Sequence, residues 1–479
     1  RLSLVGIGAV LQERDEYTTI RELVPGGPAA ASGKLKVGDR IIGVGQGVQA
    51  PITDVLGWRL DDVVALIRGK TDTTVVLSVL PANAGPDGKP TLISLGRRKI
   101  NVEAQAARKS IIEARDGTAN RRIGVISLPA FYEDFAARRK GDPNYRSATR
   151  DVSRLLAQLK KEKVDGILID LRNNGGGSLS EAVDLTGLFI DEGPVVQQRN
   201  ARGEVRIERD QQGGLAWGGP LAVLINRGSA SASEIFAAAI QDYGRGLVIG
   251  ETSYGKGTVQ TVVDLNEVAK EDKAQLGELK MTIAQFFRIN GGTTQLRGVS
   301  PDIAFPSTTY PEQFGESSSE NALPWTQIKA AEFAPAGQVT TLVPALRARH
   351  DARVARDPAF RYLLEDVAEA NVQRKSNQVS LNETERRAEL EKREAKQKLR
   401  AGNNPSAAQK APRRDDGLLA NERALSADLA EEKEQKKAKD VLLTESAKIL
   451  SDEIGLLKAN TRLAAQVLPA ASAMATQTR

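Results

Sequence analysis

Three short apolar runs limit what the centre of this chain can fold into. They occupy residues 123–128, 166–171 and 221–225 and consist mainly of Ile, Leu and Val. Apolar runs of this length predict strands that are buried on both faces, as in a parallel sheet. Because segments of helical period separate them, residues 102–310 are expected to form an α/β core in which helices layer a sheet.

The first part of the chain, residues 1–101, follows a different pattern. Short apolar stretches such as 73–80 alternate with turn sequences such as 25–28. This alternation predicts a small β-rich domain. One segment of helical period interrupts it at residues 60–68, with acidic residues near its start and Gly69 at its end, as helix termini commonly have.

The last part of the chain, residues 311–479, is rich in Glu, Lys, Arg and Ala, as in 383–396, and residues 401–405 interrupt the pattern. Such stretches predict helices with solvated faces. We expect a helical, charged C-terminal domain that acts as an appendage or an oligomerisation element rather than as a site of chemistry. The whole sequence therefore predicts a multidomain α+β protein, and it contains no run of about 18 apolar residues that would predict a transmembrane span.

The near absence of Cys and His limits the catalytic mechanisms that this chain can use. The chain has no Cys and a single His, His350, which excludes disulfides, thiolate nucleophiles, Cys-based zinc sites and His clusters. Hydrolysis without an external metal would then need Ser or Thr with a Lys base, or a pair of carboxylates. The 67 Lys and Arg residues are interspersed among 61 Asp and Glu. Since no basic block is interleaved with aromatic residues, nucleic-acid binding is not expected.

A glycine pair opens the β-rich domain, at Gly6 and Gly8 with Ile7 between them and Ala9 after them. Two such glycines let successive backbone N–H groups point into one hollow, which can hold the terminal carboxylate of a peptide. Two glycines in an ordinary turn would explain the same residues, so this motif alone decides nothing.

A second glycine-rich motif covers residues 170–177, directly after an apolar strand and before a helix expected near Leu179. A turn of this kind presents backbone N–H donors that can bind phosphate or stabilise an oxyanion. The Lys-Ser/Thr pair of a phosphate-binding loop is missing, which disfavours phosphate. A tight turn that merely needs glycine remains the structural alternative.

Two further motifs cover residues 228–236 and 250–260. The first places several serines in a turn at the start of an expected helix, where an attacking oxygen gains a positive field. A Ser-rich helix cap would explain it equally well. The second places Lys256 between two glycines, where a long amine can reach inward, although a lysine in such a loop is usually solvated.

Together the four motifs, in this order and spacing, resemble the tail-specific, C-terminal-processing serine peptidases of the Prc (Tsp) branch. The resemblance covers residues 1–310, and the charged region after 311 is similar to that branch's C-terminal extension more loosely. It implies a PDZ domain over 1–101, whose glycine loop, turn at 27–30 and strand at 37–41 appear in order. It also implies a ClpP/crotonase-like peptidase core over 102–310.

The same resemblance implies roles for individual residues. Ser231 falls on the family's nucleophile, Lys256 on its general base and Gln260 on the residue that orients the lysine. The residues implied for the oxyanion hole are Gly176, Gly177 and Ala232. Asp242 matches an acidic position of this branch, where a catalytic role and a supporting or structural role are equally open. The loop from Gly6 through Ile7 and Gly8 to Ala9 is implied to hold the substrate's carboxylate.

The function implied is that of an endopeptidase that recognises apolar, poorly folded C-terminal tails and needs no metal or organic cofactor. The resemblance further implies the periplasm of a Gram-negative bacterium, envelope proteins as substrates and a lipoprotein adaptor as partner. Because residue 1 is Arg, without a leader before it, we expect a fragment or a processed form. Two rivals stay open: a catalytically inactive PDZ scaffold, and an acyl-CoA enzyme of the crotonase type, in which a PDZ domain would have no role.

Overall fold

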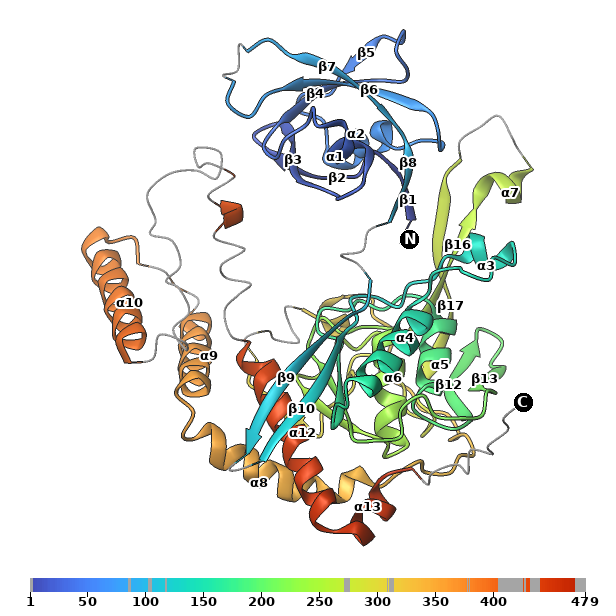
Figure 1. Ribbon diagram of the computed structural model, residues 1–479, viewed down its shortest axis with the longest axis vertical. Coiled ribbons are helices and arrows are strands. Elements are labelled where there is room, and N and C mark those ends of the chain that lie inside the picture. Colours follow the sequence, from blue (N-terminus) through green and yellow to red (C-terminus); the bar gives the residue numbers. More distant parts are fainter. Residues whose placement is uncertain are drawn as a thin grey trace. The chain divides into compact units, whose positions relative to one another are not determined.

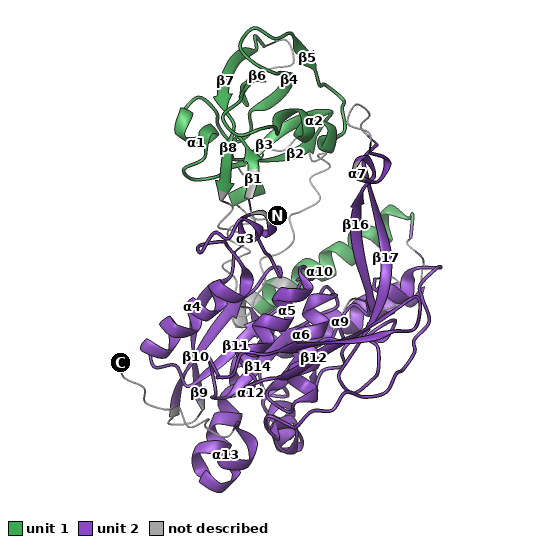
Figure 2. Cartoon of the chain, turned by 90° about the vertical axis from the view of Figure 1, so that its right-hand side faces the viewer, with its two compact units in different colours: residues 1–104, 381–439 green, residues 105–380, 440–479 purple. Residues whose placement is uncertain are grey.

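A computed structural model shows the chain as two compact units, coloured separately in Figure 2. Unit 1 comprises residues 1–104 and 381–439, and unit 2 comprises residues 105–380 and 440–479. The structure describes residues 3–84, 88–101, 106–116, 119–270, 276–307, 309, 314–376, 378, 380–403, 425, 428–430 and 440–469.

Unit 1 contains the expected β-rich domain. Its main sheet has the strand order β2-β3-β4-β6-β7, with β5 paired to β4, while β1 and β8 pair separately. The strands are β1 (Ser3–Gly6), β2 (Ala9–Arg14), β3 (Tyr17–Leu23), β4 (Arg40–Gly45), β5 (Ile52–Asp54), β6 (Thr74–Leu80), β7 (Thr91–Gly96) and β8 (Arg98–Asn101). Helix α2 (Leu60–Ile67) lies where the sequence predicts it and buries Val63 and Ile67 in the core of this domain.

Short-range sequence signals explain the small helix of this domain, α1 (Pro28–Ser32). It starts at a proline, whose fixed φ suits the first helical position, and ends at Gly33, whose φ of 62° is left-handed. Unit 1 also includes the solvated helix α10 (Glu383–Asn403), which ends inside the interruption that the sequence predicts at residues 401–405.

A six-stranded sheet forms the centre of unit 2, in the order β18-β15-β14-β11-β10-β9 (Figure 1). Its strands are β9 (Arg108–Asp116), β10 (Ala119–Ser127), β11 (Gly166–Asp170), β14 (Leu221–Ile225), β15 (Leu247–Gly250) and β18 (Ile303–Ala304). Only the β9–β10 pair is antiparallel, and β10, β11, β14, β15 and β18 run parallel. The three apolar runs are therefore β10, β11 and β14, and the predicted α/β core is confirmed.

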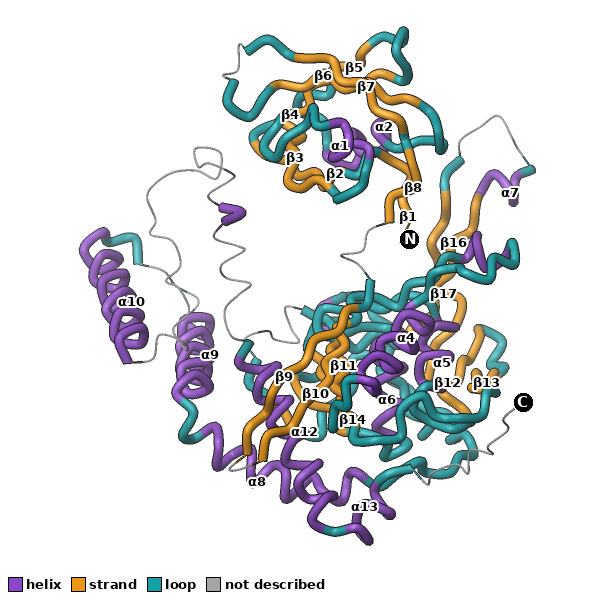
Figure 3. The backbone as a smooth tube through the Cα atoms, in the orientation of Figure 1, coloured by secondary structure: helices purple, strands orange, loops and turns teal. Residues whose placement is uncertain are grey.

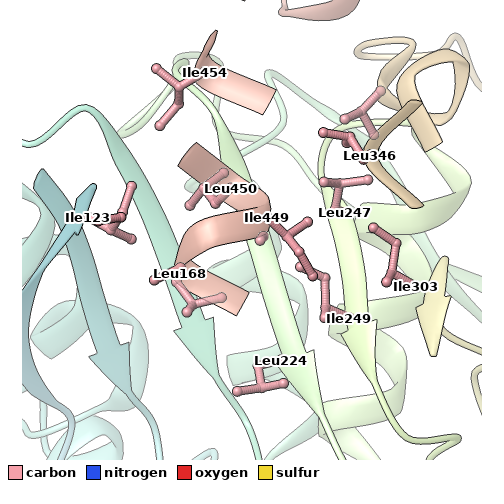
Figure 4. Close-up of a cluster of buried hydrophobic side chains, with 14 of the residues drawn as sticks. Ile123, Leu168, Leu224, Leu247, Ile249, Ile303, Leu346, Ile449, Leu450 and Ile454 are labelled. Atoms are coloured by element: carbon pink, nitrogen blue, oxygen red, sulfur yellow. The ribbon is translucent and has the colours of Figure 1, made fainter. Parts of the chain in front are cut away.

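Helices cover both faces of this sheet, as the apolar strands require. One face carries α4 (Ala148–Lys161), α5 (Leu179–Gly187) and α6 (Ala232–Asp242) (Figure 1). On the other face, α12 (Val441–Ala459) inserts Ile449 and Leu450 among strand residues such as Leu168 (Figure 4). Residues far apart in the sequence thus share one core.

A second sheet of unit 2 has the order β13-β12-β17-β16 (Figure 3). Its strands are β12 (Gly193–Asn200), β13 (Val205–Asp210), β16 (Thr258–Asp264) and β17 (Glu278–Phe287). The remaining helices of unit 2 are α3 (Phe135–Arg139), α7 (Leu265–Ala269), α8 (Val343–Val354), α9 (Pro358–Ser376) and α13 (Thr461–Val467). The predicted helical character of residues 311–479 is confirmed for the described part, but these residues divide between the two units, and the predicted boundaries at 101 and 310 stay predictions.

Candidate active site

The candidate catalytic residues follow three neighbouring parallel strands. The glycine-rich turn with Gly176 and Gly177 comes after β11, Ser231 after β14 and Lys256 after β15. Since the carboxyl ends of parallel strands meet at one edge, this order brings the three loops to the same edge of the sheet. The convergence explains why motifs about 25 to 55 residues apart in the sequence can form one site.

Ser231 is the N-cap of α6 and has an unusual backbone conformation, with φ 57° and ψ −112°. A positive φ is uncommon for a residue other than glycine and persists only where surrounding contacts enforce it. Because Ser231 directly precedes α6, its side chain lies in the positive field of the helix N-terminus.

The glycine turn fits against Ser231 with no room for a side chain. A Cβ atom on Gly176, where φ is 100°, would lie 2.8 Å from the Ser231 Cβ and 3.0 Å from the Ala232 nitrogen. The Gly176 N–H donates to Asn174 Oδ1 at 2.9 Å. By contrast, the N–H groups of Gly177 and Ala232 donate to none of the described residues. Gly177 and Ala232 are therefore the two free donors, while Gly176 contributes by letting them approach.

Glu234 links the loop that contains Ser231 to the loop that contains Lys256 through hydrogen bonds. Its Oε2 accepts hydrogen bonds from the backbone N–H of Ser231 at 2.8 Å and of Lys256 at 3.0 Å. Its Oε1 accepts from Ser253 Oγ at 2.6 Å and from the Gly255 N–H at 2.7 Å. Burial raises the pKa of Glu234 to about 7, against the opposing effect of these four donors.

Sequence reasoning did not select Glu234, although a signal was present. Ser231 and Glu234 stand three residues apart at a helix start, which is the spacing of a capping box. That spacing predicts the bond from the Glu234 side chain back to the Ser231 N–H. It could not predict the contacts with Ser253, Gly255 and Lys256, which depend on how the loop after β15 folds back.

Lys256 lies partly buried beside Gln260, as predicted. Its Nζ donates to Gln260 Oε1 at 3.5 Å. Burial lowers the pKa of Lys256 from its usual value, and the charge of Lys280 lowers it further, while Glu316 and Glu234 oppose both effects. Among the described residues no hydrogen bond joins Lys256 Nζ to Ser231 Oγ. The lysine side chain bonds to Gln260, while Glu234 holds the backbones of Lys256 and Ser231 together.

Asp242 has structural contacts. It lies at the far end of α6, an 11-residue helix and hence about 16 Å along the axis from its start. Its carboxylate accepts from Arg288 Nε at 3.0 Å and from Asn290 Nδ2 at 2.9 Å. These bonds fasten the end of α6 to the segment after β17, and they favour a structural role for Asp242 over a catalytic one.

His350 lies on the face of the sheet that α12 covers, opposite the face that carries α6. It is 5% exposed and belongs to α8, where its Nδ1 is 2.8 Å from Glu445 Oε1 on α12. No group of His, Asp or Glu residues suited to a metal ion occurs in the described part of the chain. Neither finding offers an alternative base or a metal centre near Ser231.

The glycine loop of the β-rich domain connects β1 to β2. Gly8 has φ 74°, and a Cβ there would lie 3.0 Å from Gly27 Cα, which explains the need for glycine. The N–H groups of Ile7 and Gly8 donate to none of the described residues, while the carbonyls of both accept from the Val24–Ala29 turn. Two free N–H donors therefore lie beside β2, the strand that contacts α2.

Comparison with protein families gives three successive matches along the chain. Residues 2–80 match the PDZ domain, residues 122–305 match peptidase family S41 and residues 309–455 match the C-terminal domain of tail specific protease. Residues 122–305 belong to peptidase family S41. The three matches confirm the resemblance found from the motifs.

Individual relatives of this chain are similar over much of its length. It is 44% identical over 398 residues to the tail-specific protease of Haemophilus influenzae, which covers 82% of this chain and 54% of that protein. It is 31% identical to the carboxy-terminal processing protease CtpA of Bacillus subtilis, over 63% of this chain and 56% of that protein. The chain thus spans about half the length of these relatives.

One solved structure is similar to the first part of the chain. It is the PDZ domain of a carboxy-terminal protease from Vibrio cholerae in complex with a peptide, with 56% sequence identity over 21% of this chain and all of that one, and a TM-score of 0.20.

The helices of the described residues include none with the length and apolar character that a membrane span needs.

Proposed function

We propose that this chain is a serine endopeptidase that recognises free C-terminal tails through its PDZ domain and cleaves with Ser231 as nucleophile and Lys256 as base. The observation that carries the proposal is the meeting, at one sheet edge, of Ser231, Lys256 and the free N–H donors of Gly177 and Ala232. Since His350 is buried between α8 and α12, lysine is the base that this edge offers.

The chemistry runs through an acyl-enzyme. Neutral Lys256 takes the proton of the Ser231 hydroxyl, the oxygen attacks the scissile carbonyl, and the Gly177 and Ala232 N–H groups hold the oxyanion. Loss of one such donor costs about 3 to 4 kcal/mol in comparable sites. Lysine then returns the proton to the leaving amine, and a water molecule, deprotonated by the same lysine, hydrolyses the ester.

The first proton transfer requires a movement of the lysine. Lys256 Nζ donates to Gln260 in the structure, so the side chain must turn from Gln260 toward Ser231 Oγ before it can accept the proton. Catalytic hydrogen bonds often close only in the substrate complex. Burial already lowers the pKa of Lys256, which increases the neutral fraction that such a step needs.

Tail recognition follows from the edge of the β-rich domain. The free Ile7 and Gly8 N–H groups can hold a terminal carboxylate, while β2, at the end of its sheet, can pair with an extended peptide beside α2. An apolar preference, a periplasmic location and a lipoprotein adaptor are implied by the resemblance and belong to the same proposal. An inactive PDZ scaffold is the rival function, which the intact set of Ser231, Lys256 and Gln260 disfavours.

The direct test is cleavage of an unstructured polypeptide with an apolar C-terminus. Wild-type protein should cut it, whereas Ser231→Ala should not, although it should still bind the polypeptide. A fluorophosphonate should label wild-type protein on Ser231. A wild-type protein that binds the polypeptide without cutting it or reacting with the probe would support the scaffold instead.

A further inference from the structure

Strand β16 is an open edge of the second sheet, close to the catalytic lysine. Among the strands that the structure describes, it pairs only with β17. It begins at Thr258, two residues after Lys256, and it carries Gln260. Edge strands usually resist further pairing through Lys, Pro or a bulge. Residues 258–264 contain no Lys, Arg or Pro, and their one irregularity lies between Val259 and Gln260, so the rest of the strand is regular.

The bond made by Leu265, the residue after β16, shows which backbone groups of β16 point toward β17 and which point away from it. The Leu265 N–H donates to the Gly277 carbonyl at 3.0 Å, in line with the register that pairs Val263 with Leu279. Hydrogen-bonded pairs alternate along an antiparallel ladder. The N–H and C=O groups of Val262, one position out of phase, therefore face away from β17, as do those of Gln260 and Asp264.

The surface next to this edge is apolar. Leu279 and Met281 alternate along β17 and so share one face of the sheet, where they are 47% and 43% exposed. Ile283, which is 46% exposed, is the residue that the register skips at the bulge. On β16 itself, Val262 is 55% exposed and shares the opposite face with Gln260. Successive side chains of an added strand would point to opposite faces of the sheet. Those on one face would lie on the side of the apolar β17 residues, and those on the other face would lie on the side of Gln260.

We propose that β16 binds the substrate as an added strand and so delivers an extended apolar segment to Ser231. This inference rests on the proposed function and names its mode of substrate binding. The occupant is an unfolded polypeptide because backbone pairing requires an extended chain and because the edge adjoins the catalytic lysine loop directly. Residues 260–263 would pair along about 13 Å, because Asp264 is the N-cap of α7 and its carbonyl accepts the first bond of that helix.

A matched pair of proline variants tests the proposal. Val262→Pro removes an outward N–H and leaves the β16–β17 bonds in place. Val205 is the control, because it lies on β13 at the other edge of the same sheet and is 47% exposed. The Asn200 N–H donates to the Glu204 carbonyl, which puts Val205 in the same outward phase. Val205→Pro therefore makes the same change away from the catalytic lysine.

The two measured quantities are kcat/KM for an unstructured polypeptide and the rate of Ser231 labelling by a small fluorophosphonate. We expect Val262→Pro to lower kcat/KM at least tenfold without changing the labelling rate, and Val205→Pro to leave both within twofold. The proposal would be overturned if Val262→Pro kept the wild-type kcat/KM, or if both variants lost kcat/KM equally. If either proline variant lowers the labelling rate, the lysine variants Val262→Lys and Val205→Lys replace the proline pair, and the same changes in kcat/KM and labelling rate are expected of them.

Hydrogen exchange gives an independent readout. In the Ser231→Ala protein, the polypeptide should slow exchange in residues 258–264 but not in 205–210. Protection that appears without polypeptide and grows with protein concentration would mean that two copies of the chain pair at this edge, contrary to the proposal. Failure of the proposed function looks different, because wild-type protein would then neither cleave nor react with the probe.

Discussion

The backbone N–H groups of Ser231 and Lys256 donate to one and the same oxygen, Oε2 of Glu234, at 2.8 and 3.0 Å. The residues that the family resemblance assigns as nucleophile and base are thus fixed relative to each other by a buried carboxylate. Glu234 does not touch the reacting atoms, so it acts as a positioning residue. Its four donors come from the start of α6 and from the loop after β15.

Glu234→Gln should reduce activity although it keeps size and shape. The amide nitrogen of Gln cannot accept, so it would face N–H donors that need an acceptor, at a cost of about 1 to 3 kcal/mol. We expect a fall in kcat of tenfold or more, with a smaller change in KM. Glu251→Gln is the control, because Glu251 accepts from Ser307 and lies outside this network. Equal kcat values for both variants would contradict the positioning role.

The titration of Glu234 predicts a pH dependence of stability. Burial raises its pKa from 4.5 to about 7, so the folded state binds the proton more tightly than the unfolded state. Between those values the folded protein carries more protons, and the contribution of Glu234 to stability falls as pH rises through this window. The difference in unfolding free energy between wild type and Glu234→Gln should change over pH 4.5 to 7 in urea titrations. A constant difference would count against the raised pKa.

Three adjacent glycines should respond differently to alanine. A Cβ on Gly176 would meet Ala230 O at 2.8 Å, and one on Gly177 would meet Phe131 O at 2.1 Å, whereas one on Gly175 meets nothing within 4 Å. Gly176→Ala and Gly177→Ala should therefore lose most activity, and Gly175→Ala should keep it. Steady-state kinetics on folded variants measure this. An inactive Gly175→Ala protein would show that the turn's role is not steric.

Asp242 should matter through Arg288. This ion pair is only partly buried, since the Arg288 side chain is 18% exposed, so removing one partner should cost about 3 kcal/mol, the lower end of the range for fully buried pairs. Asp242→Ala and Arg288→Ala should each lower the unfolding free energy by about this amount, and the double variant should lose little more than either single variant. Denaturant unfolding gives the three values. Additive losses would mean that the two residues act independently, against the bond seen in the structure.

The terminal carboxylate of the substrate should matter if Ile7 and Gly8 hold it. Amidation removes its negative charge, and charge-assisted hydrogen bonds contribute about 1.5 to 3 kcal/mol. We expect an amidated peptide to show a kcat/KM about tenfold or more below that of the free acid. Equal cleavage of the two peptides would refute tail recognition by this loop.

The fold was predictable where local pattern decides it. The apolar runs that form β10, β11 and β14 predicted a buried sheet. Acidic residues at the start of a segment and a glycine at its end predicted α2. The packing of α12 onto the same sheet could not be seen, because the contact of Leu450 with Leu168 spans 282 residues of sequence and has no local signal.

The site was predictable to a similar depth. The family resemblance assigned the roles of Ser231, Lys256 and the glycine turn, and those roles stay predictions, whereas the structure shows that each of the three follows a strand end. Two features depend on how loops fold back and could not be read from the sequence: the link from Glu234 to the lysine loop, and the turn of Lys256 toward Gln260 rather than Ser231.

The pH dependence of Ser231 labelling tests the Ser-Lys mechanism most directly. Labelling by a fluorophosphonate, located by mass spectrometry, should fall on Ser231 and rise with pH through an apparent pKa below the usual 10.5 of lysine, because burial lowers the pKa of Lys256. Lys256→Arg should abolish labelling, since arginine stays protonated, and His350→Ala should leave the profile unchanged. Labelling of another serine, a profile that depends on His350, or a reactive Lys256→Arg protein would contradict the mechanism.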